Sequence, residues 1–394
     1  MAQGSWHSLQ ELKIFSNHLE LQDMQHLARS TLPQLTHLEL DSCSVGPGMC
    51  KALVNGQWPH LAVLNIRGNL LKPADLQDLA QGLLPSLASL NLDHNRIGVQ
   101  SSMTGWDLCN WPHLTELTVS QCSLGVSDIQ GLVRCHWPLL AHLNVSYNSL
   151  EYTYLRSLAQ GHWPELLELR LAYNDNSAAE DLHQADWKSL RMLDLGASHC
   201  TPLEAVHAVL QVFRESLQTL NVCCEMHSVT AAVAQQQSWP CKTSLRLDIT
   251  ASAAILQSLA HEHWPIRWLS LQCLHNNTSA IAQLFQISLT RMESLSLCGH
   301  VNVGNPACRF QDGNWPALQH LDLACGLQDD FMVQLTNGQW PLLETLDLSS
   351  NYLSLQGVAQ LVAGHGPNLS LLDLQCNDFD IPFDSVSEEH DSFV

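Results

Sequence analysis

Lysine and arginine are scarce in this sequence: 394 residues hold 17 of them against 38 aspartates and glutamates, a formal net charge of −21. A chain with this charge repels phosphate backbones and anionic lipids, which disfavours nucleic acid and membrane surfaces as partners. No lysine or arginine follows Arg309, and residues 310–394 carry thirteen acidic side chains. This end of the chain is therefore either a solvated acidic surface or the docking surface for a basic partner protein.

Other features are missing as well. The chain has no run of about 18 apolar residues, and its start lacks a basic segment followed by an apolar one, so neither a membrane span nor a secretion signal is expected. Glycine-rich phosphate loops and C-x-x-C pairs do not occur. We therefore expect no cofactor, no metal, no small-molecule substrate and no enzymatic activity. We interpret the fourteen cysteines as reduced thiols of an intracellular, cytoplasmic protein.

One frame, L-x-x-L-x-L-x-x-N/C, recurs along the whole chain. Its first position is Leu9 in the first unit and Leu369 in the last, and the fifteen units begin 24 to 27 residues apart. The L-x-L stretch places apolar side chains at period two, as in a strand with one buried face. Apolar residues at offsets of three and four follow in several units, which predicts a helix after the strand. Examples are Leu76, Leu79 and Ala80; Leu155, Leu158 and Ala159; and Val358, Leu361 and Val362.

This frame resembles the leucine-rich repeat from about residue 5 to about residue 384. The usual period of 26 residues and the closing Asn or Cys are most similar to the ribonuclease-inhibitor-like and cysteine-containing intracellular subclasses. The resemblance implies an α/β solenoid of about 15 repeats, a curved horseshoe with a parallel β-sheet on the concave face and helices on the convex face. We expect a single domain over residues 1–394, with a short acidic tail at 385–394.

The closing residue of the frame turns the chain and is expected to satisfy buried backbone groups there. It is Asn or Cys in nine units: Asn17, Cys43, Asn69, Asn95, Cys122, Asn148, Asn174, Asn351 and Asn377. Six consecutive units, beginning at Leu190, Leu217, Lys242, Ile266, Met292 and Leu318, lack it; the last of them has Gly326 instead. These departures indicate either a change of curvature, a functional patch or simple divergence.

A glycine and a tryptophan mark the junction between units. Glycine precedes proline by three residues in six units, and we expect it to form a left-handed cap at the end of each helix. These glycines are Gly56, Gly82, Gly161, Gly313, Gly338 and Gly364. Tryptophan stands directly before proline in eight units, from Trp58 to Trp340. We interpret this series as rings that stack on one another along the rim of the solenoid, not as a ligand site.

The two ends of the chain are unusual for a solenoid, whose terminal repeats need polar caps. The first predicted strand, with Leu9, Leu12 and Ile14, begins almost at Met1, so we expect either a fragment of a longer protein or a weak cap. At the other end Phe379, Ile381 and Phe383 alternate with aspartates, which predicts a small C-terminal cap.

Candidate binding residues are the non-apolar positions inside the strand frame, because the resemblance places them on the concave face. One cluster comes from two adjacent units at matching positions: His142, Tyr147, Glu168, Arg170 and Tyr173. Tyrosine and arginine are favoured interface anchors. For this cluster the alternative is an ordinary ladder of surface side chains. The second candidate is Trp268, and its alternative is a local slip of register.

A third candidate is the aspartate ladder at one strand position, formed by Asp322, Asp347 and Asp373. It is either part of the L-D-L consensus or the docking surface for the basic partner. The function that we expect is a non-catalytic scaffold that binds a protein partner on its concave face. Two alternatives are a recognition or sensing arm of a larger machine (a ubiquitin ligase or an innate-immune-type receptor) and a GTPase-activating protein, which some repeat crescents with acidic ends resemble.

Overall fold

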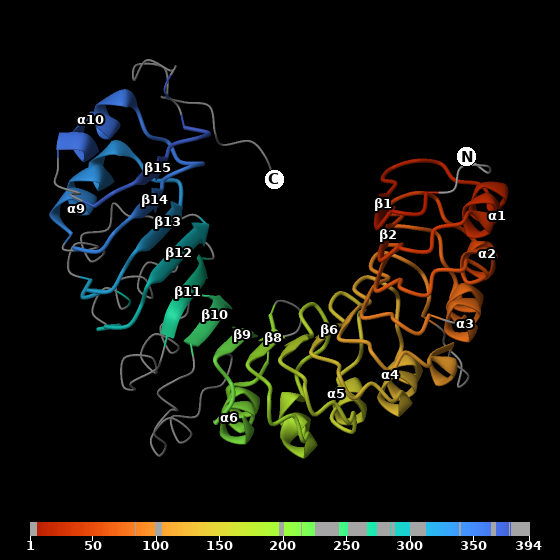
Figure 1. Ribbon diagram of the computed structural model, residues 1–394. Coiled ribbons are helices and arrows are strands. Elements are labelled where there is room, and N and C mark those ends of the chain that lie inside the picture. Colours follow the sequence, from red (N-terminus) through yellow and green to blue (C-terminus); the bar gives the residue numbers. More distant parts are fainter. Residues whose placement is uncertain are drawn as a thin grey trace, which may run out of the picture. The chain divides into compact units, whose positions relative to one another are not determined.

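The computed structural model describes residues 6–82, 84–98, 105–196, 201–213, 215–224, 244–250, 266–273, 284, 288–299, 313–338, 340–363, 368–377 and 379. They belong to two compact units, Met1–Cys223 and Cys224–Val394. Both units contain short parallel strands that follow one another in chain order, and several of these strands are followed by a helix (Figure 1). The α/β leucine-rich-repeat solenoid is therefore confirmed as the fold, while the single domain and the number of repeats stay predictions.

The first unit contains nine of the strands. They are β1 (Glu11–Lys13), β2 (His37–Glu39), β3 (Val63–Asn65), β4 (Ser89–Asn91), β5 (Glu116–Thr118), β6 (His142–Asn144), β7 (Glu168–Arg170), β8 (Met192–Leu195) and β9 (Thr219–Cys224). Its helices are α1 (Leu21–Arg29), α2 (Met49–Leu53), α3 (Pro73–Gln81), α4 (Val126–Arg134), α5 (Tyr154–Leu158) and α6 (Leu203–Val212), with 3₁₀ turns η1 (Gly105–Leu108) and η2 (Ala179–Gln184). Within this unit the strands line the inner side of the arc and the helices the outer side (Figure 1).

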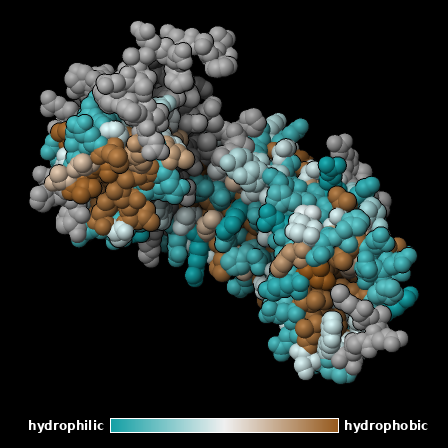
Figure 2. All heavy atoms as spheres, turned by 90° about the horizontal axis from the view of Figure 1, so that it is seen from above, coloured by the Kyte–Doolittle hydropathy of each residue, from teal (hydrophilic) through white to brown (hydrophobic). Residues whose placement is uncertain are grey.

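The second unit repeats this order. Its strands are β10 (Ser244–Thr250), β11 (Ile266–Cys273), β12 (Ser294–Gly299), β13 (His320–Ala324), β14 (Thr345–Asp347) and β15 (Leu371–Asp373). Its described helices are α9 (Met332–Asn337) and α10 (Leu355–Ala363), and the 3₁₀ turn η4 (Asp329–Phe331) precedes α9. Seen from above, hydrophobic side chains gather on one part of this unit (Figure 2). Leu355, Val362 and Leu371 near its end are exposed.

The period-two pattern explains the strands. The middle leucine of the three-residue strands β2 to β7 and β14 is buried, as at Leu143 in β6 and Leu169 in β7, and the residues on either side of it are more exposed. In the first and last strands, β1 and β15, the middle leucines Leu12 and Leu372 are only partly buried. Helix α3 buries Leu76, Leu79 and Ala80, as its spacing predicts. Helix α10 forms as predicted, with Val358 and Leu361 partly buried, but Val362 is exposed.

The closing asparagines perform the predicted role. Asn148 accepts hydrogen bonds from backbone N–H groups of the preceding repeat and donates to three backbone carbonyls. In two other units a single thiol takes the place of the asparagine amide. The Cys43 thiol donates to Ile14 O over 2.8 Å, and the Cys122 thiol donates to Leu92 O over 3.0 Å. Burial raises the pKa of Cys122 to about 12, which keeps the thiol protonated as a donor. These cysteines are structural.

Two sequence expectations about this frame are wrong. The unit that begins at Leu318 does have a closing residue, Cys325, one position before Gly326. Its N–H donates to Asn351 Oδ1 and its thiol to Leu297 O, the same bonds that Cys43 makes. The repeat that contains β13 is one residue shorter than the usual period. Counting along the frame from Leu318 therefore reaches Gly326, one position past the closing residue.

The glycine caps are the second error. Gly82 and Gly338 end their helices with φ of −71° and −67° and ψ near 146° and 145°, which is extended backbone that any residue adopts. At Gly56, Gly161, Gly313 and Gly338 the reason for glycine lies instead in the tryptophan two residues later, whereas a Cβ on Gly82 would lie 2.4 Å from the side chain of Val54. A Cβ on Gly161 would lie 2.5 Å from the ring of Trp163, and one on Gly338 would lie 2.3 Å from the ring of Trp340. Gly364 lies outside the described residues.

The tryptophan series is confirmed as a stacked rim. Trp111 and Trp137 are fully buried, with ring centroids 6.3 Å apart and an angle of 6° between the planes. Trp315 and Trp340 stack in the same way in the second unit. Trp239 and Trp264 lie outside the described residues, as do Ile381 and Phe383 of the predicted C-terminal cap.

Candidate functional site

The outward residues of the strands form rows across the sheet, because neighbouring strands pair in register. His142 pairs with Glu168, and Asn144 pairs with Arg170. Equivalent positions in parallel strands lie about 5 Å apart. Of the five predicted residues, His142 and Glu168 therefore lie directly opposite each other, and Arg170 lies opposite Asn144. We call His142, Tyr147, Glu168, Arg170 and Tyr173 the β6–β7 strip.

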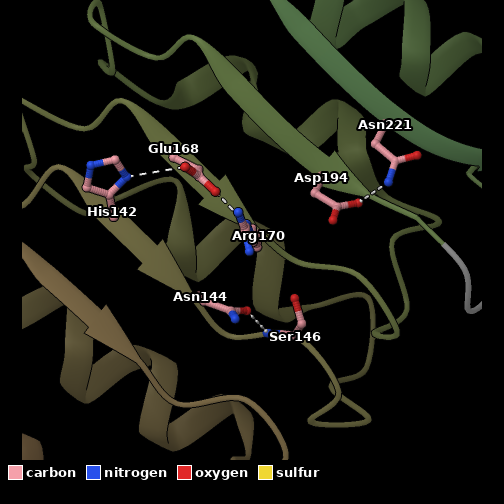
Figure 3. Close-up of polar contacts among 7 residues, drawn as sticks. All are labelled: His142, Asn144, Ser146, Glu168, Arg170, Asp194 and Asn221. Carbon is pink, nitrogen blue, oxygen red and sulfur yellow. Dashed lines mark hydrogen bonds and ion pairs between the residues drawn. The ribbon is translucent and has the colours of Figure 1, made fainter. Parts of the chain in front are cut away.

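One part of the β6–β7 strip is a charged network that Glu168 organises (Figure 3). One carboxylate oxygen faces His142 Nδ1 at 3.3 Å, and the other accepts a hydrogen bond from Arg170 Nε. The Glu168 side chain is 24% exposed, against 47% for His142 and 49% for Arg170. Exposed pairs of this kind add little stability. Glu168 instead orients the side chains of His142 and Arg170, which it holds in one geometry on an exposed strand face.

The other part is a pair of stacked tyrosines. The ring centroids of Tyr147 and Tyr173 are 3.9 Å apart, the planes differ by 15°, and each residue is 43% exposed. The side-chain contact with Tyr173 raises the pKa of Tyr147 above its ordinary value, and the negative charge of Asp194 adds to this. Tyrosine is among the residue types enriched at the positions that dominate binding in protein interfaces.

The backbone explains why these rings stack. Tyr147 and Tyr173 adopt φ of 58° and 57°, the left-handed region that residues other than glycine rarely occupy. The same turn position is left-handed at Ser42, His94 and Gln121. Its N–H donates to the next repeat, from Tyr147 to Ala172 O and from Tyr173 to Gly196 O. The turn is thus built into the repeat, and successive side chains at this position are brought side by side.

A neighbouring contact was not foreseen in the sequence. Asp194 Oδ1 accepts hydrogen bonds from Asn221 Nδ2 at 2.8 Å and from the N–H of Gly196 at 2.9 Å, beside the β6–β7 strip (Figure 3). Asn144 makes the same turn with the N–H of Ser146. The signal that identifies it is a polar oxygen at one fixed strand position, two residues before the N–H that it accepts.

This recurring turn bears directly on the aspartate ladder. Asp322, Asp347 and Asp373 occupy adjacent places in register on β13, β14 and β15. Asp347 and Asp373 accept from the N–H groups of Ser349 and Gln375, as Asn144 does from Ser146. The consensus aspartate therefore has a local structural role in addition to its charge.

Replacing Asp322 with asparagine is expected to raise the free energy of unfolding at neutral pH by about 0.5 kcal/mol. Burial raises the pKa of Asp322, the hydrogen bond from Ser296 opposes this, and the charge of Asp347 raises it further. A carboxyl whose pKa is higher in the folded state destabilises the fold above that pKa, and the penalty disappears as the pH falls through it. Urea unfolding at neutral and acidic pH measures the difference, which should shrink in acid. Loss of stability at neutral pH would contradict this, and exposed Asp330→Asn is the matched control.

Trp268 lies on β11 and is half-buried, in register with Ser294 of β12. Opposite β10 the register shifts between Leu245 and Arg246, so Arg267 is an extra residue just before Trp268. The local irregularity that the sequence offered as an alternative is therefore present. Whether Trp268 contacts a partner stays a prediction.

Two further features concern the described residues: groups of possible metal ligands and helices that could cross a membrane. Among these residues, no group of three or more His, Cys, Asp or Glu side chains could hold a metal ion. None of the described helices is long and apolar enough to cross a membrane.

Comparison with known proteins finds similarity among solved structures. No family model and no curated protein matches it. Among solved structures, an internalin, InlF, from Listeria monocytogenes is 17% identical over 93% of this chain and 87% of its own, with a TM-score of 0.46. LegL7, a leucine-rich repeat-containing protein from Legionella pneumophila, is 14% identical over 78% of this chain and all of its own, with a TM-score of 0.43. Rad7, seen in complex with Elc1 in yeast, is 19% identical over 66% of this chain and 69% of its own, with a TM-score of 0.41.

Proposed function

We propose that this chain is a non-catalytic scaffold that binds a protein partner on the strand face of its repeats, with the β6–β7 strip at the centre of the contact. The observation that carries the proposal is the exposed stack of Tyr147 and Tyr173 next to an oriented Arg170. Tyrosine and arginine dominate binding energy at protein interfaces. Both stand on regular strands and repeated turns, so little conformational entropy is lost when a partner docks.

The size of the surface also supports a protein partner. A standard interface covers about 800 Å² on each side. Rows from β5 to β8, with outward residues at two positions per strand and at the turn, offer a regular surface for the centre of such an interface, and neighbouring repeats would supply the rest. A basic partner for the acidic residues 310–394 and a cytoplasmic location accompany this proposal. The recognition-arm and GTPase-activating alternatives remain predictions, and copurification of ligase subunits or of a GTPase would favour one of them.

Changing both tyrosines to serine is expected to weaken partner binding at least about ten-fold, because a central aromatic anchor contributes about 2 kcal/mol or more. Serine fits the left-handed turn, since Ser16, Ser42 and Ser350 occupy it in this chain. A photo-crosslinking amino acid at Glu116, on the strand next to the β6–β7 strip, reports the bound partner in cell extract.

The matched control is Tyr152→Ser. Tyr152 is 53% exposed but lies just before α5, away from the strand face. Crosslinking from Glu116 should survive in this control and fall in the Tyr147→Ser/Tyr173→Ser variant. A partner that crosslinks equally well to both variants would refute the strand-face scaffold.

A further inference from the structure

Two cysteines occupy the same place in adjacent repeats, on the outer side of the strands. Cys109 directly follows the 3₁₀ turn η1, and Cys135 caps the C-terminus of α4. Each stands two residues before a tryptophan of the stacked rim. Both are free thiols on half-buried residues, whereas Cys122 is fully buried. A small reagent can therefore approach this pair, which the closing thiol at Cys122 does not allow.

The two thiols are directed at one stretch of backbone. Cys109 Sγ donates to Gly105 O over 3.7 Å. Cys135 Sγ donates across the repeat boundary to Trp106 O over 3.2 Å. Because Gly105 and Trp106 are consecutive residues of η1, their carbonyl groups bring the two sulfur atoms together, and the two thiols are also hydrogen-bonded to each other. A sulfur–sulfur bond requires this side-by-side placement.

The surrounding side chains hold the two repeats in register. The rings of Trp111 and Trp137 stack with their centroids 6.3 Å apart. Arg134 Nε donates to Asp107 Oδ1 over 2.7 Å and so connects α4 to η1 next to the pair. A disulfide needs Cα atoms about 4.4 to 6.8 Å apart, and the repeat spacing at these rings lies within that range. The two repeats therefore need no large movement to accept the bond.

We propose that Cys109 and Cys135 are a site of covalent modification, at which a small-molecule disulfide oxidises the two thiols to a bond between the repeats. The thiolate of one cysteine attacks a sulfur of the reagent, the S–S bond of the reagent breaks, and one small thiol leaves. The other cysteine then attacks the mixed disulfide and releases the second small thiol. The two protons of the cysteines end on the two small thiols, and the two electrons reduce the reagent, so no further reactant is needed.

The surroundings favour the oxidised pair but slow its formation. Burial raises the pKa of the Cys109 thiol well above its ordinary value, and the hydrogen bond with Cys135 and the charge of Asp107 raise it further. A dithiol is easily kept reduced when its surroundings stabilise the thiolate, and these surroundings do the opposite. Exchange proceeds through the thiolate, so its rate should rise about ten-fold for each unit of pH across the neutral range.

The experiment treats the reduced full chain with hydroxyethyl disulfide, a neutral reagent that the acidic chain does not repel, and then blocks the remaining thiols with N-ethylmaleimide. Trypsin cleaves after Arg134 and thereby separates the two cysteines, on peptides 97–134 and 135–156. Mass spectrometry without reductant is expected to find these two peptides linked in most chains at mildly alkaline pH. Treatment with reductant should separate them again.

Three serine variants identify the bond. Cys109→Ser should abolish the linked peptides and leave a hydroxyethyl mixed disulfide on Cys135, and Cys135→Ser should leave one on Cys109. Cys376→Ser removes an exposed thiol of the second unit and should not change the yield. The proposal is overturned by separate mixed disulfides on Cys109 and Cys135 of the unaltered chain. Linked peptides that survive in Cys109→Ser, which would join through Cys122, overturn it as well, as does a chain that carries the reagent only on Cys376.

A second measurement tests whether the bond fits the folded repeats. The oxidised chain should unfold at a higher urea concentration than the reduced chain, because the bond restricts the unfolded state. The same treatment should leave the midpoint of Cys109→Ser unchanged. An unchanged or lower midpoint in the oxidised chain would show that the bond strains η1 and α4, and the pair would then not be a disulfide site of the folded protein.

Discussion

Replacing Asn148 with alanine is expected to lower the free energy of unfolding by about 4 kcal/mol. Asn148 is 5% exposed and joins two repeats. It accepts from the N–H groups of Cys122 and Leu124 and donates to the carbonyls of Val119, Val145 and Ser146. Alanine leaves these buried groups without their partner. Urea unfolding followed by far-UV circular dichroism measures the loss.

Two further variants test the cause. Asn148→Cys should lose only about half as much, because Cys43 and Cys122 show that a thiol at this position donates to a carbonyl of the preceding repeat. Asn17→Ala is the matched control at the same frame position, where the amide is exposed and donates only to Phe15 O. Its cost should stay within about 0.5 kcal/mol. Equal losses for Asn148→Ala and Asn17→Ala would show that the buried bonds do not matter.

The frame predicts the strands well because its signal is local and repeated. Each L-x-L pair encodes which side chains are buried, and Leu143 and Leu169 follow that code. The closing asparagine is equally legible, since an amide both donates and accepts at a turn. Cys325 was missed for a physical reason: the shortened repeat moves the turn by one residue, and only the hydrogen bond to Asn351 reveals it. Counting positions cannot detect such a shift.

The candidate site was predictable in part. Matching positions in adjacent repeats predicted that His142 and Glu168 would meet, since register follows from the period. The stack of Tyr147 on Tyr173 was not predictable, because it depends on a left-handed turn that the residue type itself disfavours. The role of Asp194 was hidden for a similar reason. Its acceptor bond is to a backbone N–H two residues later, and the consensus position alone suggests only charge.

Replacing Gly161 with alanine is expected to lower the free energy of unfolding by about 2 to 3 kcal/mol, although a single methyl group is added. The new Cβ would lie 2.5 Å from the ring of Trp163, which is fully buried and stacks on Trp187 with centroids 5.9 Å apart. Trp187 Nε1 also donates to Gly161 O over 2.9 Å. Relieving the clash therefore disturbs the stack and this hydrogen bond together. Urea unfolding monitored by tryptophan fluorescence measures the change.

Gly46→Ala is the matched control, because its added Cβ has only Ser44 O nearby, at 3.6 Å, and the expected change is within about 0.5 kcal/mol. The deciding variant repeats Gly161→Ala in a Trp163→Ala background. Without the ring, the methyl group meets no clash, and alanine should be neutral or slightly stabilising, because it restricts the unfolded chain. A glycine needed for a left-handed backbone would instead cost the same in both backgrounds. The double variant thus separates a requirement of the backbone from a requirement of the neighbouring ring, and only the second agrees with the extended glycines at Gly82 and Gly338.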